Sequence, residues 1–231
     1  MALPNSSDQK ESALAFHEVR GIAFDLDDTL FCRQRAFRSL MMEWIDTKDS
    51  LAEIIRRDQQ GYGDRNAFFA WLAESHFPDT TGNALEAQFI RELPKHISIQ
   101  KNSLQVLNAL KNRAYPIALL TNGGSTLQRA KLQSTGLLPC FEKSHILISE
   151  ELEQGKPHPS AFLALSQVMN LPARQILYVG DHLANDIEGS QKAGMQSTWM
   201  RRERSIPEEL PARVFVIDTL EELLPHLPGH E

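Results

Sequence analysis

The chain has 231 residues, of which 42% are hydrophobic and 23% are charged, and its formal net charge is −6. These values are typical of an ordinary globular protein, long enough for one large α/β domain or for a core with a small accessory domain. The negative charge gives no indication of a nucleic-acid-binding surface, because Arg and Lys are scattered apart from the pair Arg201-Arg202, which we interpret as part of a solvated loop.

The first predicted element is a buried strand that ends in carboxylates. Gly21-Ile22-Ala23-Phe24 is a short apolar run, typical of a strand buried on both faces, and Asp25-Leu26-Asp27-Asp28-Thr29 follows it directly. Open α/β sheets bind ligands at the carboxyl ends of their strands. Asp25 and Asp27 would point to the same side of a continued strand and would repel each other without a cation or a shared proton. For this cluster alone, a polar turn that caps the next helix is the alternative.

Residues from about Arg33 to Ile97 interrupt the strand–helix pattern and are predicted to form several helices. Apolar residues recur at helical spacing over 36–55, over 68–72 with Pro78 as the stop, and over 84–93. Gly61-Tyr62-Gly63-Asp64 is the pronounced break between the first two. We therefore predict an inserted all-helical domain, residues 33–97, within a core domain formed by residues 1–32 and 98–231.

An alternation of strands and helices resumes after the insertion. Strands are predicted at 116–120, 146–148, 176–179, 197–200 and 214–217, and helices at 104–110, 125–134, 160–169, 184–193 and 219–227. Strands separated by connections of helix length indicate a parallel sheet. The predicted fold class is α/β, a doubly wound, Rossmann-like parallel-sheet core with an inserted helical cap domain.

Polar residues stand where these strands end. Thr121 and Asn122 follow the second strand, Asp181 follows the fourth with Asp186 shortly after, and Lys156 lies on a loop between them. Each residue alone is equally typical of a turn, a surface lysine or a helix-surface charge. Together with the first strand they place carboxylates, a hydroxyl and a cation at one sheet edge.

This set of groups suits phosphoryl transfer. A phosphate monoester needs fixed donors and a metal to neutralise its oxygens, and a nucleophile opposite the leaving oxygen. A carboxylate nucleophile forms an acyl phosphate, which divides one difficult step into two. Mg²⁺ is held by one or two carboxylates and a substrate phosphate.

The motif Asp25-Leu26-Asp27-Asp28-Thr29 matches the DxDxT signature of the haloacid dehalogenase (HAD) superfamily. Thr121, Lys156, and Gly180-Asp181 with Asn185-Asp186 resemble the other three motifs of that superfamily, in the same order. The resemblance covers the chain from about Arg20 to Leu224. The helical insertion is similar to the small cap of the branch that resembles phosphoglycolate phosphatase.

The resemblance implies a role for each motif residue. Asp25 is expected to be the nucleophile and Asp27 the general acid/base. Thr121, Asn122 and Lys156 are expected to bind the phosphoryl group. The predicted Mg²⁺ site comprises Asp25, the backbone carbonyl of Asp27, Asp181 and Asp186, the last of which supports the metal or orients Lys156.

The presence of Asp27 favours hydrolysis of a phosphate ester, because dehalogenases that resemble this fold lack this second aspartate. A phosphomutase would use the same core and is one alternative. A non-catalytic phosphoryl- or metal-binding signalling module is another, although receiver domains are about half this length. The predicted partner is a small phosphorylated metabolite, with no nucleic acid and no membrane, and the chain is expected to be a monomer or homodimer.

The break from Gly61 to Arg65 is the candidate for contacting the part of the substrate away from the phosphate. Tyr62 and Arg65 are the residues proposed for that contact, and Arg65 would pair with a carboxylate or a second phosphate of the substrate. A simple turn, with Tyr62 packed beneath it and Arg65 paired with Asp64, accounts for the segment equally well.

The location is predicted to be cytoplasmic. The two cysteines, Cys32 and Cys140, form neither a disulfide framework nor a metal-ligand pattern, which fits a reducing compartment. The first nine residues lack the apolar centre of a secretory signal, and no apolar run approaches membrane-spanning length.

Overall fold

The computed structural model describes residues 16–99, 101–202 and 204–228, and these form two compact units. The core unit contains the described residues up to Phe31, from Lys101 to Ser125, and from Leu137 onward. The helical unit contains Cys32–Ile99 and Thr126–Gly136. The sequence assigns only 33–97 to the insertion, whereas the structure groups a segment from much later in the chain with it.

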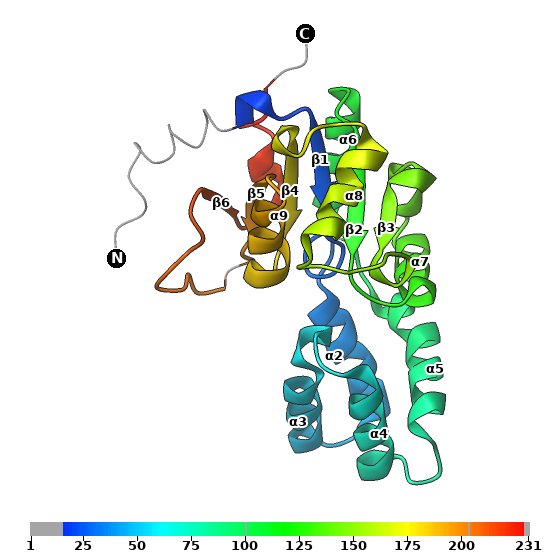
Figure 1. Cartoon of the computed structure of the whole chain (residues 1–231). Coiled ribbons are helices and arrows are strands. Elements are labelled where there is room, and N and C mark those ends of the chain that lie inside the picture. Colours follow the sequence, from blue (N-terminus) through cyan, green and yellow to red (C-terminus); the bar gives the residue numbers. More distant parts are fainter. Residues whose placement is uncertain (1–15, 100, 203, 229–231) are drawn as a thin grey trace. The chain divides into compact units, whose positions relative to one another are not determined.

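The core unit is built on a six-stranded parallel sheet with the order β3-β2-β1-β4-β5-β6 (Figure 1). All six predicted strands are confirmed, as β1 Gly21–Phe24, β2 Ile117–Thr121, β3 Ile146–Ile148, β4 Ile176–Gly180, β5 Gln196–Met200 and β6 Val214–Ile217. The chain adds β2 and β3 on one side of β1 and then crosses to add β4, β5 and β6 on the other side, so the strand order reverses between β1 and β4. This switch point is where open α/β sheets bind their ligands.

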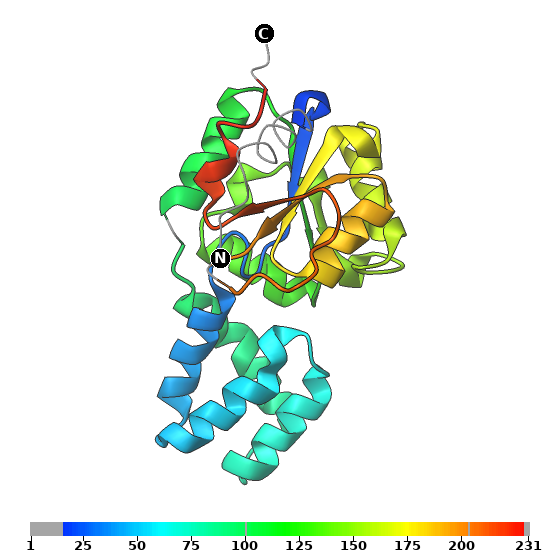
Figure 2. The same cartoon turned by 90° about the vertical axis from the view of Figure 1, so that its left-hand side faces the viewer.

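Helices cover both faces of the sheet, as a doubly wound fold requires. In Figure 2, α6 (Lys101–Asn112) and the short η9 (Leu220–Leu223) lie on one side of the strands, and α8 (Pro159–Met169) and α9 (Gly189–Lys192) lie on the other. One face of the sheet packs against α8. There, Phe162 and Leu165 of α8 share a core cluster with Ala23 of β1, Leu120 of β2 and Tyr178 of β4. The alternation of side chains along a strand sends the remaining residues of each strand to the opposite face.

Two predicted helices of the core unit differ in the structure. The segment predicted as 184–193 begins as a single π-helical stretch, η8 (Leu183–Glu188), before α9, and such stretches are frequent at functional sites. The predicted helix over 219–227 is wrong, because only the 3-10 turn η9 forms. Thr219 starts this turn with a capping box to Glu222, and Pro225, which has no N–H, follows it closely. Shorter 3-10 turns lie at η1 Phe16–Glu18, η4 Leu138–Cys140, η5 Lys143–His145, η6 Ser149–Glu151 and η7 Ala173–Gln175.

The helical unit packs its helices around an aromatic core. Its elements are α2 Arg33–Trp44, α3 Lys48–Asp58, η2 Gln59–Gly61, α4 Arg65–His76, α5 Gly82–Glu92, η3 Leu93–His96 and most of α7 Ser125–Ser134. The apolar pattern over 36–55 is split into α2 and α3, since Ile45 and Thr47 have extended backbone angles. Both helices bury apolar residues in the same cluster, so the pattern continues across the break. Within the part of the chain that is described, no helix is both long and apolar enough for a membrane span.

Candidate active site

Three buried aspartates meet at the carboxyl ends of β1 and β4. Asp25 follows β1 and extends its register, since its backbone N–H donates to Val179 O at 2.9 Å. Asp181 follows β4, and Asp186 lies in η8. One carboxylate oxygen from each lies within 4.8 Å of the others, and all three residues are buried. Carboxylates this close repel each other unless a cation lies among them.

The close approach depends on a glycine. A Cβ built on Gly180 would lie 2.4 Å from Cβ and Cγ of Asp186, a distance that no side chain can occupy. Gly180 therefore permits η8 to bring Asp186 against the end of β4. The Gly180-Asp181 pair of the sequence motif thus combines a carboxylate with the space for a second one.

Lys156 is a cation that the chain itself places against two of these carboxylates. Its Nζ donates to Asp25 Oδ1 at 2.5 Å and to Asp186 Oδ1 at 2.7 Å, and its side chain is buried. Asn122 fixes the backbone of Lys156: Asn122 Nδ2 donates to Lys156 O at 2.7 Å, and Lys156 N donates to Asn122 Oδ1 at 2.9 Å. The predicted Asn122 thus holds the lysine loop against the end of β2.

The three aspartates outnumber the cations that contact them, Lys156 and Arg204. Burial raises the pKa of Asp25 to about 7, although Lys156 opposes the shift. Burial, together with the charges of Asp186 and Asp25, raises the pKa of Asp181 well above its usual value. Asp181 Oδ1 is buried and makes no hydrogen bond within the described residues. An orphaned carboxylate oxygen among excess negative charge fits a hard divalent cation, which takes oxygen ligands.

The other predicted site residues of the core unit lie on adjoining strand ends. Thr121 is the last residue of β2 and is buried. Asp27 is half-buried in the loop after β1, where it forms an isolated bridge with Phe31. Thr29 of the same loop donates from Oγ1 to Asp25 Oδ2 at 3.3 Å. The roles of Thr121 and Asp27 in catalysis stay predictions.

Tyr178 belongs to the same network, although it lies outside the four sequence motifs. Its hydroxyl accepts from Lys156 Nζ at 3.0 Å and donates to Leu120 O at 2.9 Å. Tyr178 thereby positions the ammonium group of Lys156 from within the sheet. A tyrosine within the apolar run of 176–179 was the indication in the sequence, because a buried tyrosine needs a partner for its hydroxyl.

Comparison with known proteins agrees with this geometry. The family model for haloacid dehalogenase-like hydrolases matches residues 19–194. The chain belongs to this family. That match begins before β1 and ends after α9, and so contains the three aspartates, Lys156 and the whole helical insertion.

Relatives of this HAD-like hydrolase include proteins named for different phosphorylated compounds. The pyrimidine 5'-nucleotidase YjjG of Escherichia coli is 32% identical over 140 residues, which are 60% of this chain and 61% of that protein. The glyceraldehyde 3-phosphate phosphatase of Methanopyrus kandleri is 26% identical over 199 residues, 80% of this chain and 84% of that protein. The crystal structure of YfnB from Bacillus subtilis bound to magnesium has a TM-score of 0.73 at 26% identity and covers 90% of this chain and 98% of that one.

The interpretation of Arg201-Arg202 as a solvated loop is wrong. Arg201 donates from Nε to Asp218 Oδ1 at 2.8 Å. Arg202 donates from Nε to Asp28 O at 2.5 Å and from Nη2 to Thr29 O at 2.6 Å, so it holds the loop that carries the DxDxT motif. No local pattern indicates this pairing, because 174 residues separate the two partners of the first contact.

The Gly61–Arg65 segment lies wholly in the helical unit. Arg65 Nη1 pairs with Asp58 Oδ1 at 2.7 Å, so the alternative ion pair with Asp64 is not the one formed. Asp64 instead caps α4 by accepting from Ala67 N at 3.1 Å. Tyr62 is 43% exposed. Substrate contacts of Tyr62 and Arg65 stay predictions.

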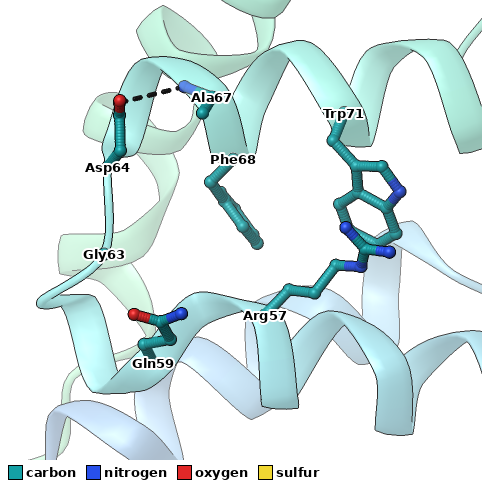
Figure 3. Close-up of a pocket in the computed structure, with 7 residues that line it drawn as sticks. All are labelled: Arg57, Gln59, Gly63, Asp64, Ala67, Phe68 and Trp71. Atoms are coloured by element: carbon teal, nitrogen blue, oxygen red, sulfur yellow. Dashed lines mark hydrogen bonds between the residues drawn. The ribbon is translucent and has the colours of Figure 1, made fainter.

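A small cavity of about 230 Å³ borders this segment inside the helical unit (Figure 3). Phe68 points into it, and the guanidinium of Arg57 lies over the ring of Trp71 at 4.2 Å from its centroid. Gly63 and Asp64 form part of its wall, with Gln59 and Ala67. The exposed break therefore adjoins a recessed aromatic surface.

Proposed function

We propose that this HAD-like hydrolase is a magnesium-dependent phosphatase that hydrolyses a small phosphate monoester through an aspartyl-phosphate intermediate. The observation that carries the proposal is the buried group of Asp25, Asp181 and Asp186, in which Lys156 pairs with Asp25 and Asp186 and Asp181 Oδ1 has no partner within the described chain. The names of the two relatives and the magnesium in the YfnB crystal structure support it.

In this mechanism Asp25, Asp181 and the backbone carbonyl of Asp27, with support from Asp186, would hold Mg²⁺, which would supply positive charge to the phosphoryl oxygens. Asp25 must be ionised to act as the nucleophile. Burial and the charge of Asp186 disfavour the ionised form, while the positive charge of Lys156 favours it. Lys156, 2.5 Å from Asp25 Oδ1, also holds the carboxylate in place before substrate arrives.

The reaction proceeds in two displacements. A carboxylate oxygen of Asp25 bonds to phosphorus while the bond from phosphorus to the alcohol oxygen breaks, and Asp27 protonates the departing alcohol. Asp27 then takes a proton from water, whose oxygen attacks phosphorus and releases phosphate from Asp25. Lys156 and Thr121 bind the phosphoryl oxygens in both steps.

The substrate is proposed to be a small phosphorylated metabolite. The relatives are named for a nucleotide and for a triose phosphate, so the shared core is compatible with different leaving groups. We also propose a cytoplasmic location, with which the two free cysteines are consistent.

The direct test is hydrolysis of p-nitrophenyl phosphate by the purified protein, with Mg²⁺ and with excess EDTA, followed by a panel of phosphorylated sugars, nucleotides and small acids. We expect Mg²⁺-dependent release of inorganic phosphate that EDTA abolishes. Conversion of a sugar phosphate to its isomer without phosphate release would indicate a phosphomutase. Absence of turnover on every compound would favour a signalling module, and full activity in EDTA would contradict the metal assignment.

A further inference from the structure

The segment after β5 returns to the carboxylate group through Arg204. Its Nη1 donates to the backbone carbonyl of Asp181 at 2.6 Å, and its Nη2 donates to Asp181 Oδ2 at 2.7 Å. Trp199 Nε1 also donates to the carbonyl of Asp181 at 2.8 Å. Asp181 is 2% exposed, so this is a largely buried two-point contact between a guanidinium and a single residue.

The contact divides the two oxygens of the Asp181 carboxylate. Oδ2 is occupied by Arg204, while Oδ1 is buried and makes no hydrogen bond in the described parts of the chain. A guanidinium that binds the carbonyl and one carboxylate oxygen of the same residue restricts rotation of that carboxylate. Oδ1 is thereby the oxygen left for a further ligand.

We infer that Arg204 is a positioning residue that orients the Asp181 carboxylate so that Oδ1 is available to the divalent cation. The inference rests on the proposed metal-dependent function. Hydrogen-bond partners that orient metal-binding side chains typically affect metal affinity by about 10–100-fold when they are removed. The two hydrogen bonds from the Arg204 guanidinium to Asp181 are of this kind.

If Arg204 served only as a counter-charge to Asp181, its removal would change the Mg²⁺ affinity in the opposite direction. Arg204 carries a positive charge, so as a mere counter-charge it would repel the cation and compete with it for Asp181. Removing it would then strengthen Mg²⁺ binding. Weaker binding after removal is expected only if the orientation of Asp181 outweighs the charge.

The experiment is isothermal titration calorimetry of Mg²⁺ into the full-length protein, compared among wild type, Arg204→Gln, Arg204→Lys and Arg201→Gln. Arg201 is the matched control, since it lies in the same segment but pairs with Asp218. We expect Arg204→Gln to weaken Mg²⁺ binding by about 10–100-fold. Arg204→Lys should also weaken it, since one ammonium does not reproduce the planar fork. Arg201→Gln should keep the wild-type affinity.

The activity of the same variants provides a second readout. Arg204→Gln should need more Mg²⁺ for half-maximal turnover and should approach the wild-type rate at saturating Mg²⁺. Unchanged or tighter Mg²⁺ binding in folded Arg204→Gln would overturn the inference while leaving the proposed function intact. If Arg204→Gln does not fold, Arg204→Lys decides in the same way. A wild-type protein that binds no Mg²⁺ would instead refute the metal-dependent function on which the inference rests.

Discussion

Both units bury a cluster of charged side chains, but only in the helical unit do the cations outnumber the carboxylates. There, Asp58 accepts from Arg33 at 2.6 and 2.9 Å and from Arg65 at 2.7 Å. Burial alone would raise the pKa of Asp58, but the hydrogen bonds and charges of the two guanidiniums outweigh it and leave the pKa lowered. The cluster joins α2, α3 and α4 and has more positive than negative groups.

The cluster of the core unit has the opposite excess. Its three aspartates outnumber the two cations that contact them, since Lys156 pairs with Asp25 and Asp186 and Arg204 pairs with Asp181. The pKa values of Asp25 and Asp181 are raised, to about 7 for Asp25. A lowered carboxyl pKa indicates a charge already neutralised by the fold, whereas raised values in a group of carboxylates indicate a site that gains from an added cation. The comparison therefore separates a cluster that the fold neutralises from one that favours an added cation, without reference to any motif.

The largest predicted effect follows from removing a functional carboxylate. Asp25→Asn keeps the side-chain shape but removes the attacking charge, so turnover should fall to the background rate. Its free energy of unfolding in EDTA should not decrease, because the substitution relieves repulsion with Asp181 and Asp186. Steady-state assays and urea unfolding measure the two quantities. Residual turnover close to that of wild type would exclude Asp25 as the nucleophile.

Asp27→Asn is predicted to have the next largest effect. General acid/base catalysis typically contributes about 10²–10⁴-fold in rate, and the alcohol leaving group needs its proton in the first step. Rapid-quench measurement of phospho-enzyme formation should therefore show a large loss for an alkyl phosphate. p-Nitrophenyl phosphate should lose little, because p-nitrophenolate departs without a proton. Equal losses for the two esters would argue against the role of Asp27.

In the helical unit the corresponding substitution should reduce stability instead. Asp58→Asn leaves the buried guanidinium of Arg33 and the half-buried guanidinium of Arg65 without their carboxylate. Breaking a buried ion pair costs about 3–5 kcal/mol of unfolding free energy. The exposed pair of Arg57 and Glu53 is the control, and Glu53→Gln should change the stability by no more than about 1 kcal/mol. Urea unfolding measures both variants. An Asp58→Asn protein as stable as wild type would show that the cluster is not structural.

A smaller effect is expected from pH. Because the pKa of Asp58 is lowered in the fold from its ordinary value of 3.8, its ionised form stabilises the fold above about pH 4. That contribution is lost as the pH falls from 3.8 through the lower folded pKa. Trp44 and Trp71 lie in the helical unit, so their fluorescence in a Trp199→Phe background can follow its unfolding. The same acid titration of Asp58→Asn should lack this contribution, and superimposable curves would exclude Asp58 as its source.

The position of the aspartate cluster in the core unit could be predicted from the sequence to a greater degree than that of the Asp58 cluster. Asp25 and Asp181 each follow a recognisable strand directly, and the carboxyl ends of parallel strands meet at one edge. Lys156 lies on the loop just before α8. The six strands were predictable from equally local features, since a short apolar run bounded by polar residues is typical of a buried strand.

The remaining contacts join residues that no local pattern connects. Arg202 and Arg204 reach the loops after β1 and β4 from beyond β5, across a separation that periodicity does not describe. Similarly, Asp58 rather than the adjacent Asp64 pairs with Arg65, because the chain reverses between α3 and α4. The break between α2 and α3 leaves no mark in the apolar pattern, because both helices bury residues in one core.

The smallest predicted effect concerns substrate choice. Tyr62 is 43% exposed, so Tyr62→Ala should change the free energy of unfolding by no more than about 0.5 kcal/mol. Arg65 is a poorer probe, since it pairs with Asp58 and its guanidinium lies over Phe68 and Phe69. If the Gly61–Arg65 segment contacts the part of the substrate away from the phosphate, Tyr62→Ala should alter relative kcat/KM values across a panel of phosphorylated metabolites.

The rate on p-nitrophenyl phosphate should stay near that of wild type in the same variant, because this compound offers little beyond its phosphate for the segment to contact. Met42 is the matched control: it is 60% exposed on α2 of the same unit and lies outside the segment. Met42→Ala should leave both the ranking of substrates and the generic rate unchanged. If Tyr62→Ala ranks the substrates in the same order as wild type by kcat/KM, Tyr62 does not determine specificity. Equal losses on every compound, p-nitrophenyl phosphate included, would instead mean that Tyr62 supports the reaction itself. A side chain that contacts only the leaving group changes the rates of different substrates unequally, because their leaving groups differ in the atoms they present to that side chain.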